Sequence, residues 1–152
     1  NGRGIAVLTR TSNPGAADIQ EKFVDGEPVF MRMAKAFHEK GQKLKGDSTD
    51  WSGMMLVAGA TAPEEARQIR EAAPDNLLLV PGYGAQGAGA AEAVAGFVPV
   101  NGTLEGGVVN ASRSVTFPEA AQKAGTVEEW QHAISEAIKF AQDDLLKATQ
   151  NC

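Results

Sequence analysis

The sequence predicts an α/β fold with a parallel sheet, and three observations support this prediction. Four short apolar runs have the length of buried strands. Segments whose apolar residues recur at helical spacing follow these runs. Each run also ends in a polar or glycine-rich loop. Because ligands bind at the carboxyl ends of parallel strands, the four loops indicate one shared site.

The composition is that of one globular domain spanning residues 1–152. Hydrophobic residues make up 43% of the chain and charged residues 22%, so the chain can bury a core. The net charge of −5 disfavours nucleic acid or an anionic membrane as a partner. No apolar run approaches the roughly 18 residues of a membrane helix, and no segment resembles a signal peptide.

The single cysteine and the first residue of the chain add two expectations. Cys152 has no second cysteine for an internal disulfide, which suits a reducing, cytoplasmic location. The chain begins with Asn1 rather than Met, so we expect a processed product or a piece of something longer.

The first half of the chain contains two predicted strand–helix units, with strands at residues 5–9 and 54–58. A turn at Asn13-Pro14-Gly15 ends the first strand, and a polar loop covers residues 40–50. Thr61 and Glu64 form a predicted capping box for a helix that runs to about residue 73. An earlier helix is predicted from near Pro28, because apolar residues recur at Val29, Phe30, Met33, Ala34 and Phe37.

The second half contains two more units, with strands at residues 77–80 and 107–111. The alanine-rich residues 85–95 are predicted as a helix weakened by glycine, and residues 99–106 as a loop. Thr126 and Glu129 form a capping box for the last helix. Its apolar face comprises Val127, Trp130, Ile134, Ile138, Ala141 and Leu145.

The glycine-rich turn at residues 81–87 is a candidate anion site. It connects a strand to a predicted helix N-terminus, where unpaired N–H groups and the helix dipole favour negative charge. The Gln86 amide adds a donor. An ordinary strand-to-helix turn explains the same glycines.

Arg113 is the second candidate for anion binding, because it follows the fourth strand directly. A guanidinium at that position could hold a phosphate through two hydrogen bonds. An arginine paired with a carboxylate at the rim of the sheet is the alternative. Gln86 and Arg113 follow consecutive strands, and the loops after strands seven and eight form a recurrent phosphate site in (β/α)₈ barrels. This agreement favours the anion site.

The remaining polar residues of the loops predict no catalytic group. Ser12 and Asn13 could bind the edge of a polar ring, although turn chemistry explains them nearly as well. Arg10 either points into the site or pairs with an acidic neighbour. No lysine, histidine or acidic pair stands at a strand end. The two histidines are predicted on helix faces without metal-ligand spacing, at positions His38 and His132.

Four segments of the sequence resemble motifs of orotidine 5′-phosphate decarboxylase. Their residues resemble those of the bacterial second subfamily of that enzyme. They cover residues 10–15 (RTSNPG), 58–65 (AGATAPEE), 81–87 (PGYGAQG) and 110–114 (NASRS), and the match extends from residue 3 to about residue 117. The resemblance implies a dimeric (β/α)₈ TIM barrel. It also implies conversion of orotidine 5′-phosphate to UMP and CO₂ in pyrimidine biosynthesis, without a metal or an organic cofactor.

The resemblance assigns phosphate binding to the loops after the last two strands of the barrel. Gln86, after strand seven, and Arg113, after strand eight, would hold the 5′-phosphate. The backbone around Gly84 and Ser112 would complete the phosphate cradle.

The resemblance also implies the contacts of the base and a missing part of the enzyme. Ser12 would contact the pyrimidine ring and Pro81 would form a wall of its pocket. The Asp-x-Lys-x-x-Asp motif, whose lysine protonates the product carbanion in the family, is absent from this sequence. The chain therefore supplies no catalytic residue.

The number of strand–helix units agrees with half of a barrel. Four units are half of eight, and a complete barrel takes about 250 residues. We therefore expect strands five to eight, the C-terminal half, with two exposed strand edges that need the N-terminal half or self-association. The complete barrel would form a homodimer. The alternative is a non-catalytic phosphate- or nucleotide-binding half barrel that self-associates.

Overall fold

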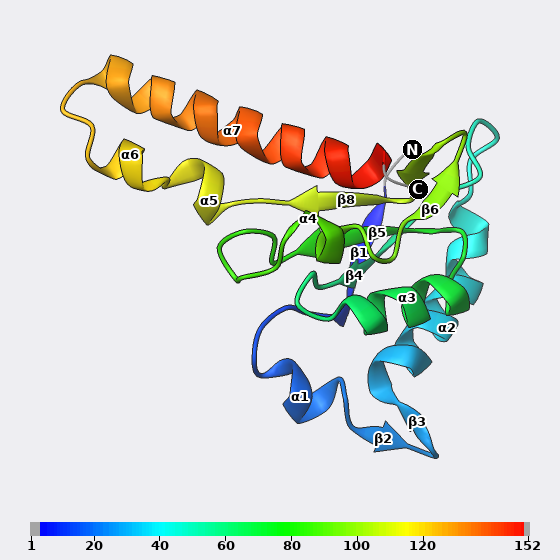
Figure 1. Ribbon diagram of the computed structural model, residues 1–152. Coiled ribbons are helices and arrows are strands. Elements are labelled where there is room, and N and C mark those ends of the chain that lie inside the picture. Colours follow the sequence, from blue (N-terminus) through cyan, green and yellow to red (C-terminus); the bar gives the residue numbers. More distant parts are fainter. Residues whose placement is uncertain (1–3, 151–152) are drawn as a thin grey trace.

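A four-stranded parallel sheet forms the centre of the molecule, in a computed structural model that describes residues 4–150 (Figure 1). Its strands are β1 (Ile5–Arg10), β4 (Ser52–Ala58), β5 (Asn76–Pro81) and β8 (Gly107–Asn110), in the order β1-β4-β5-β8. All three pairings are parallel, which confirms the predicted α/β class and its four strands. The residue that begins the family resemblance, Arg3, and Cys152 lie outside the described residues.

A helix follows each strand of the sheet. These helices are α2 (Val29–Gly41), α3 (Pro63–Ala72), α4 (Ala90–Ala93) and α7 (Val127–Gln150). Figure 1 shows the long α7 running beside β8, with α2 and α3 together at another part of the sheet. Shorter helical turns lie in the connections, at α1 (Ala16–Ile19), η1 (Gln42–Leu44), α5 (Arg113–Thr116) and α6 (Glu119–Gln122). In residues 4–150, no helix is both long and apolar enough to cross a membrane.

The core lies between the sheet and these helices. Leu56 and Leu78 are fully buried there, together with Ile69 of α3. Val7 and Val109 of the two outer strands pack against the same cluster. Because alternate residues of a strand point to opposite faces, Leu8 and Val108 point away from the helices. They are 66% and 52% exposed, so the second face of the sheet is apolar and open at both ends.

Two small hairpins project from the connections. The segment 99–106, predicted as a loop, contains an antiparallel pair formed by β6 (Val98–Val100) and β7 (Thr103–Glu105). A second antiparallel pair, β2 (Phe23–Val24) and β3 (Glu27–Pro28), was not predicted. Both turns need positive φ at two successive residues, which Asn-Gly and Asp-Gly adopt readily. The φ angles are 52° and 81° at Asp25-Gly26, and 51° and 85° at Asn101-Gly102.

The helices predicted from near Pro28, from residue 61 to about residue 73, and from Thr126 are confirmed as α2, α3 and α7. The extent of the helix at residues 85–95 and the capping box of α3 were predicted wrongly. In the segment 85–95 only α4 is helical, because the loop before it contains Gly87 with a φ of 91°. Thr61 does not cap α3: the N-cap is Ala62, and the Thr61 hydroxyl donates to the Ser12 carbonyl at 3.2 Å. The predicted box of α7 is present, because the Thr126 and Glu129 side chains each accept from the other's backbone N–H at 3.2 Å.

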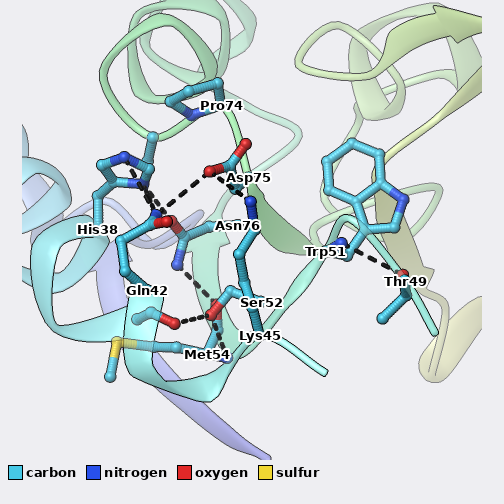
Figure 2. Close-up of polar contacts among 12 residues, drawn as sticks. His38, Gln42, Lys45, Thr49, Trp51, Ser52, Met54, Pro74, Asp75 and Asn76 are labelled. Atoms are coloured by element: carbon cyan, nitrogen blue, oxygen red, sulfur yellow. Dashed lines mark hydrogen bonds and ion pairs between the residues drawn. The ribbon is translucent and has the colours of Figure 1, made fainter. Parts of the chain in front are cut away.

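A polar cluster closes the sheet at the amino ends of its strands (Figure 2). Asn76 donates to the Met54 carbonyl at 2.8 Å and contacts His38 Nδ1 at 2.9 Å. His38 therefore has a structural role on α2, as predicted. Asp75 accepts from Lys45 at 2.9 Å, and this bond lowers the pKa of the Asp75 carboxyl below its usual value.

Arg70 of α3 closes the same end of the sheet near β5 and β8. Its buried guanidinium donates to the carbonyls of Asn76 and Gly106 at 2.7 Å each. It also lies 5.1 Å from the centre of the Trp51 ring. Burial lowers the pKa of Arg70 to about 10, so the side chain stays charged at neutral pH.

Candidate functional site

A cavity of about 550 Å³ lies at the carboxyl ends of the four strands. All four strand-end loops contribute to it, which places Ser12, Gln86 and Arg113 around one space. Gln86 and Arg113 are exposed and Ser12 is half-buried. The complete lining is Arg10, Ser12, Asn13, Pro14, Glu21, Thr61, Gln86 and Arg113.

Ser12 sits between two glycines that let its loop approach the sheet. A Cβ at Gly59 would lie 2.7 Å from the Ser12 backbone nitrogen and 2.8 Å from its Cα. A Cβ at Gly82 would lie 2.9 Å from the Ser12 Cβ and 3.3 Å from Gln86 Oε1. Real Cβ atoms do not tolerate contacts below about 3 Å, so a larger residue at either position would move the loop. The three loops after β1, β4 and β5 thus meet at Ser12.

The glycine-rich loop is held by its own backbone. The Gly84 N–H donates to the Ala88 carbonyl and the Gly87 N–H to the Gly84 carbonyl, both at 2.9 Å. The Ala85 N–H donates to the Tyr83 carbonyl at 3.0 Å. The expectation of unpaired N–H groups therefore does not hold at these three positions. The side chains of Gln86 and Arg113 add donors at this end of the cavity.

The loops after β5 and β8 touch at Gly84, whose φ is 72°. A Cβ at Gly84 would lie 3.1 Å from Ser114 Oγ, so the absence of a side chain allows this close approach. Ser114 follows Arg113 in α5 and is half-buried. The contact keeps Gln86 and Arg113 on the same side of the cavity.

Tyr83 connects the glycine-rich loop to α7. Its hydroxyl donates to Asp144 Oδ2 at 2.8 Å, and its ring is 6% exposed. Burial, and then the Asp144 carboxylate, raise the pKa of Tyr83 to about 12, because both oppose the phenolate. The tyrosine is therefore a neutral anchor of the loop.

Arg10 pairs with acidic neighbours, which answers the question that the sequence left open. Its NH2 group lies 2.6 Å from Glu21 Oε1 and 3.6 Å from Glu65 Oε1. Its NH1 group donates to the Thr11 carbonyl at 2.8 Å. Glu21 and Glu65 were missed in the sequence, because neither stands in a strand-end loop.

Three of the predicted binding residues lie next to the cavity and outside its lining. Pro81 ends β5, and its carbonyl accepts from the Ala60 N–H at 2.8 Å. Ser112 is the N-cap of α5, and Asn110 donates to its hydroxyl at 3.3 Å. Gly84 lies in the glycine-rich loop and faces Ser114 of α5. These residues shape the strand ends that carry Gln86 and Arg113.

The lining is suited to binding an anionic, polar ligand. It combines the Arg113 guanidinium with two carboxamides and two hydroxyl groups, whereas the Arg10 guanidinium is paired with Glu21 of the same lining; it contains no lysine or histidine. Among residues 4–150, no group of three or more His, Cys, Asp or Glu side chains is arranged to hold a metal ion. The side chains present can bind and orient a phosphate ester.

Sequence comparison relates the chain to known enzymes. No family model matches it. The orotidine 5′-phosphate decarboxylase of Rhodopirellula baltica is 38% identical over 137 residues, which is 88% of this chain and 44% of the relative. The chain is a homologue of orotidine 5′-phosphate decarboxylase. The decarboxylase of Cupriavidus taiwanensis is 39% identical over 115 residues, covering 76% of this chain and 39% of the relative.

The fold comparison leads to the same family. A Toxoplasma gondii protein described as an orotidine monophosphate decarboxylase superposes with a TM-score of 0.64 at 26% identity. The superposition covers 93% of this chain and 51% of that one. The chain thus spans about half the length of the decarboxylases it matches, and its sheet corresponds to about half of a TIM barrel.

Proposed function

We propose that this chain supplies the phosphate- and pyrimidine-binding half of an orotidine 5′-phosphate decarboxylase. In this proposal its four strands are strands five to eight of the barrel, of the bacterial second-subfamily type. The observation that carries the proposal is the meeting of Ser12, Gln86 and Arg113 around one cavity. These residues come from three separate loops, each of which carries a motif of the family.

The chemistry of the three side chains supports their proposed roles. The Arg113 guanidinium offers two parallel donors to a phosphate, and Gln86 adds a neutral donor. Ser12, which lies across the cavity from the end of β8, can donate to or accept from the polar edge of a pyrimidine. In an enzyme of this kind, the free energy of binding the distant phosphate helps to lower the activation barrier at the reacting carbon.

The proton chemistry belongs to residues outside this sequence. The Asp-x-Lys-x-x-Asp motif does not occur among its 152 residues. We propose that the N-terminal half of the barrel supplies this motif. The open edges of β1 and β8 are the places where further strands would join the sheet.

Ligand binding tests the role of Arg113. We expect Arg113→Ala to weaken UMP and ribose 5-phosphate about tenfold or more, because a charge-assisted contact to phosphate is lost. Uridine, which has no phosphate, should bind equally to both proteins. Isothermal titration calorimetry measures all three ligands. Equal losses for UMP and uridine would remove Arg113 from phosphate binding.

Complementation tests the decarboxylase assignment. The chain is combined with the N-terminal half of the Rhodopirellula baltica relative, and loss of orotidine 5′-phosphate absorbance is followed. We expect turnover only when both halves are present. Turnover by the rigorously pure chain would contradict the proposal. UMP binding without turnover in any combination would favour a non-catalytic nucleotide-binding half barrel. The absence of lysine and histidine from the cavity lining is consistent with this alternative.

A further inference from the structure

We infer that Arg10 is a positioning residue that holds the loop carrying Ser12 in its binding conformation. This inference rests on the proposed role of Ser12 in contacting the pyrimidine. Arg10 is the last residue of β1 and is 8% exposed. A buried guanidinium at a strand end requires partners that compensate its charge.

The partners of Arg10 come from three parts of the chain around the loop. The Thr11 carbonyl, at 2.8 Å, lies where the loop leaves β1. Glu21, at 2.6 Å, lies beyond α1, where the loop ends. Glu65, at 3.6 Å, belongs to α3. One planar guanidinium therefore ties both ends of the loop to each other and to a neighbouring helix.

The same contacts argue against a direct role in ligand binding. Both terminal nitrogens of Arg10 already face protein oxygens. Its Nε is buried from solvent and has no hydrogen-bond partner in the structure. Arg10 can therefore influence a ligand in the cavity through the loop, at Ser12.

Two neutral hydrogen bonds complete the attachment of the loop. Gln20 Oε1 accepts from the Thr11 N–H at 2.8 Å, and Thr61 donates to the Ser12 carbonyl at 3.2 Å. The fork geometry of Arg10 distinguishes it from a lysine, which cannot hold three oxygens in fixed directions. We therefore expect Arg10→Lys to behave more like a loss of the residue than like a conservative change.

Amide hydrogen exchange tests the hold on the loop without any ligand. In Arg10→Met, amides of residues 11–20 should exchange about tenfold faster, whereas those of β5 should keep their wild-type rates. Arg67→Met is the matched control, because Arg67 pairs with Glu64 on the exposed surface of α3 and should change neither set. Unchanged exchange of residues 11–20 in Arg10→Met would overturn the inference.

A second variant serves if Arg10→Met does not fold. Glu21→Ala removes one partner of Arg10. Because the Glu21 side chain itself is 41% exposed, the sheet should remain intact. It should accelerate exchange in the same residues by a smaller factor. Wild-type exchange in this variant would equally contradict the role of the pair.

Ligand discrimination tests whether the loop acts through Ser12. Arg10→Met should weaken UMP about tenfold and leave ribose 5-phosphate within about twofold, because only the pyrimidine contact is disturbed. In a Ser12→Ala background the same change should cost UMP less than about twofold. Equal losses for both ligands, or additive losses in the double variant, would overturn the inference.

The two experiments separate the inference from the proposed function. If the wild-type chain bound neither UMP nor ribose 5-phosphate, with or without the complementary half, the proposed function would fail. The exchange rates of residues 11–20 would still decide whether Arg10 holds the loop.

Discussion

Two glycines determine how closely Ser12 approaches the sheet. Gly59 and Gly82 have no Cβ, and each faces atoms of Ser12 at distances that a Cβ could not occupy. Gly59 has an ordinary φ, so at this position the glycine is needed for the space that it leaves free and not for its conformational freedom. The position of Ser12, a predicted ligand contact, thus depends on Gly59 and Gly82, which have no proposed ligand contact through a side chain.

Replacing one of these glycines should displace the loop. We expect Gly59→Ala to lower the free energy of unfolding by about 1–3 kcal/mol, because its methyl group would collide with the Ser12 backbone. UMP binding should weaken as well. Urea unfolding and calorimetry measure the two effects. Gly46→Ala is the control, since no atom lies within 4 Å of its Cβ; equal effects of both variants would contradict the steric explanation.

At the scale of elements, the hydrogen bond from Tyr83 to Asp144 joins the glycine-rich loop to α7. The helix has little other burial, because Ala141 is its single buried residue within 127–150. The sequence predicted α7 well, since a long apolar period and a capping box are local signals. It could not predict the tyrosine contact, which depends on how two distant segments pack.

The titration of Tyr83 reports its burial and, by comparison with an Asp144 variant, this contact. Tyr83 is the only tyrosine in the chain, so the ultraviolet absorbance of phenolate reports it alone. We expect a midpoint near pH 12, and Asp144→Asn should lower it toward the ordinary value. Because the folded pKa is raised, the contribution to stability is complete below about pH 10 and is lost as the pH rises toward 12. A wild-type midpoint near 10 would contradict the contact.

The two short hairpins could not be predicted from hydrophobic periodicity. Strands of two or three residues, such as β2 and β6, are too short to show alternation. The turn pairs Asp25-Gly26 and Asn101-Gly102 were the available signal, since both favour positive φ.

The partners of Arg10 could not be predicted either, because Glu21 and Glu65 become its neighbours only in the folded chain.

At the scale of the whole molecule, the helices cover one face of the sheet and leave the other open. We call the side that carries Leu8, Leu79 and Val108 the open face; Val57 lies on the same side but is only 4% exposed. Val57, Leu79 and Val108 are aligned across three strands by the sheet register. The sequence predicted the four strands because their apolar runs have the length of buried strands, and it placed the ligand loops at one edge because parallel strands share a direction.

Burial of the open face should govern association with the complementary half of the barrel. We expect Val108→Lys to weaken that association about tenfold or more, because a buried valine contributes about 1.5–3 kcal/mol. The free energy of unfolding of the isolated chain should change by less than about 0.5 kcal/mol, since the Val108 side chain is 52% exposed. Analytical ultracentrifugation of the mixed halves measures the effect. Phe23→Lys, on the hairpin and 70% exposed, is the control; equal weakening by both variants would contradict a specific interface.

The strand order β1-β4-β5-β8 repeats the order of these strands along the chain. Each strand therefore pairs with the sheet strand that precedes it along the chain. The unit β4-α3-β5, with one helix as its connection, closes the shortest loop and is the natural place for folding to begin. Pairing between successive strands keeps each closed loop shorter than it would be in a reordered sheet, and a shorter loop costs less entropy to close.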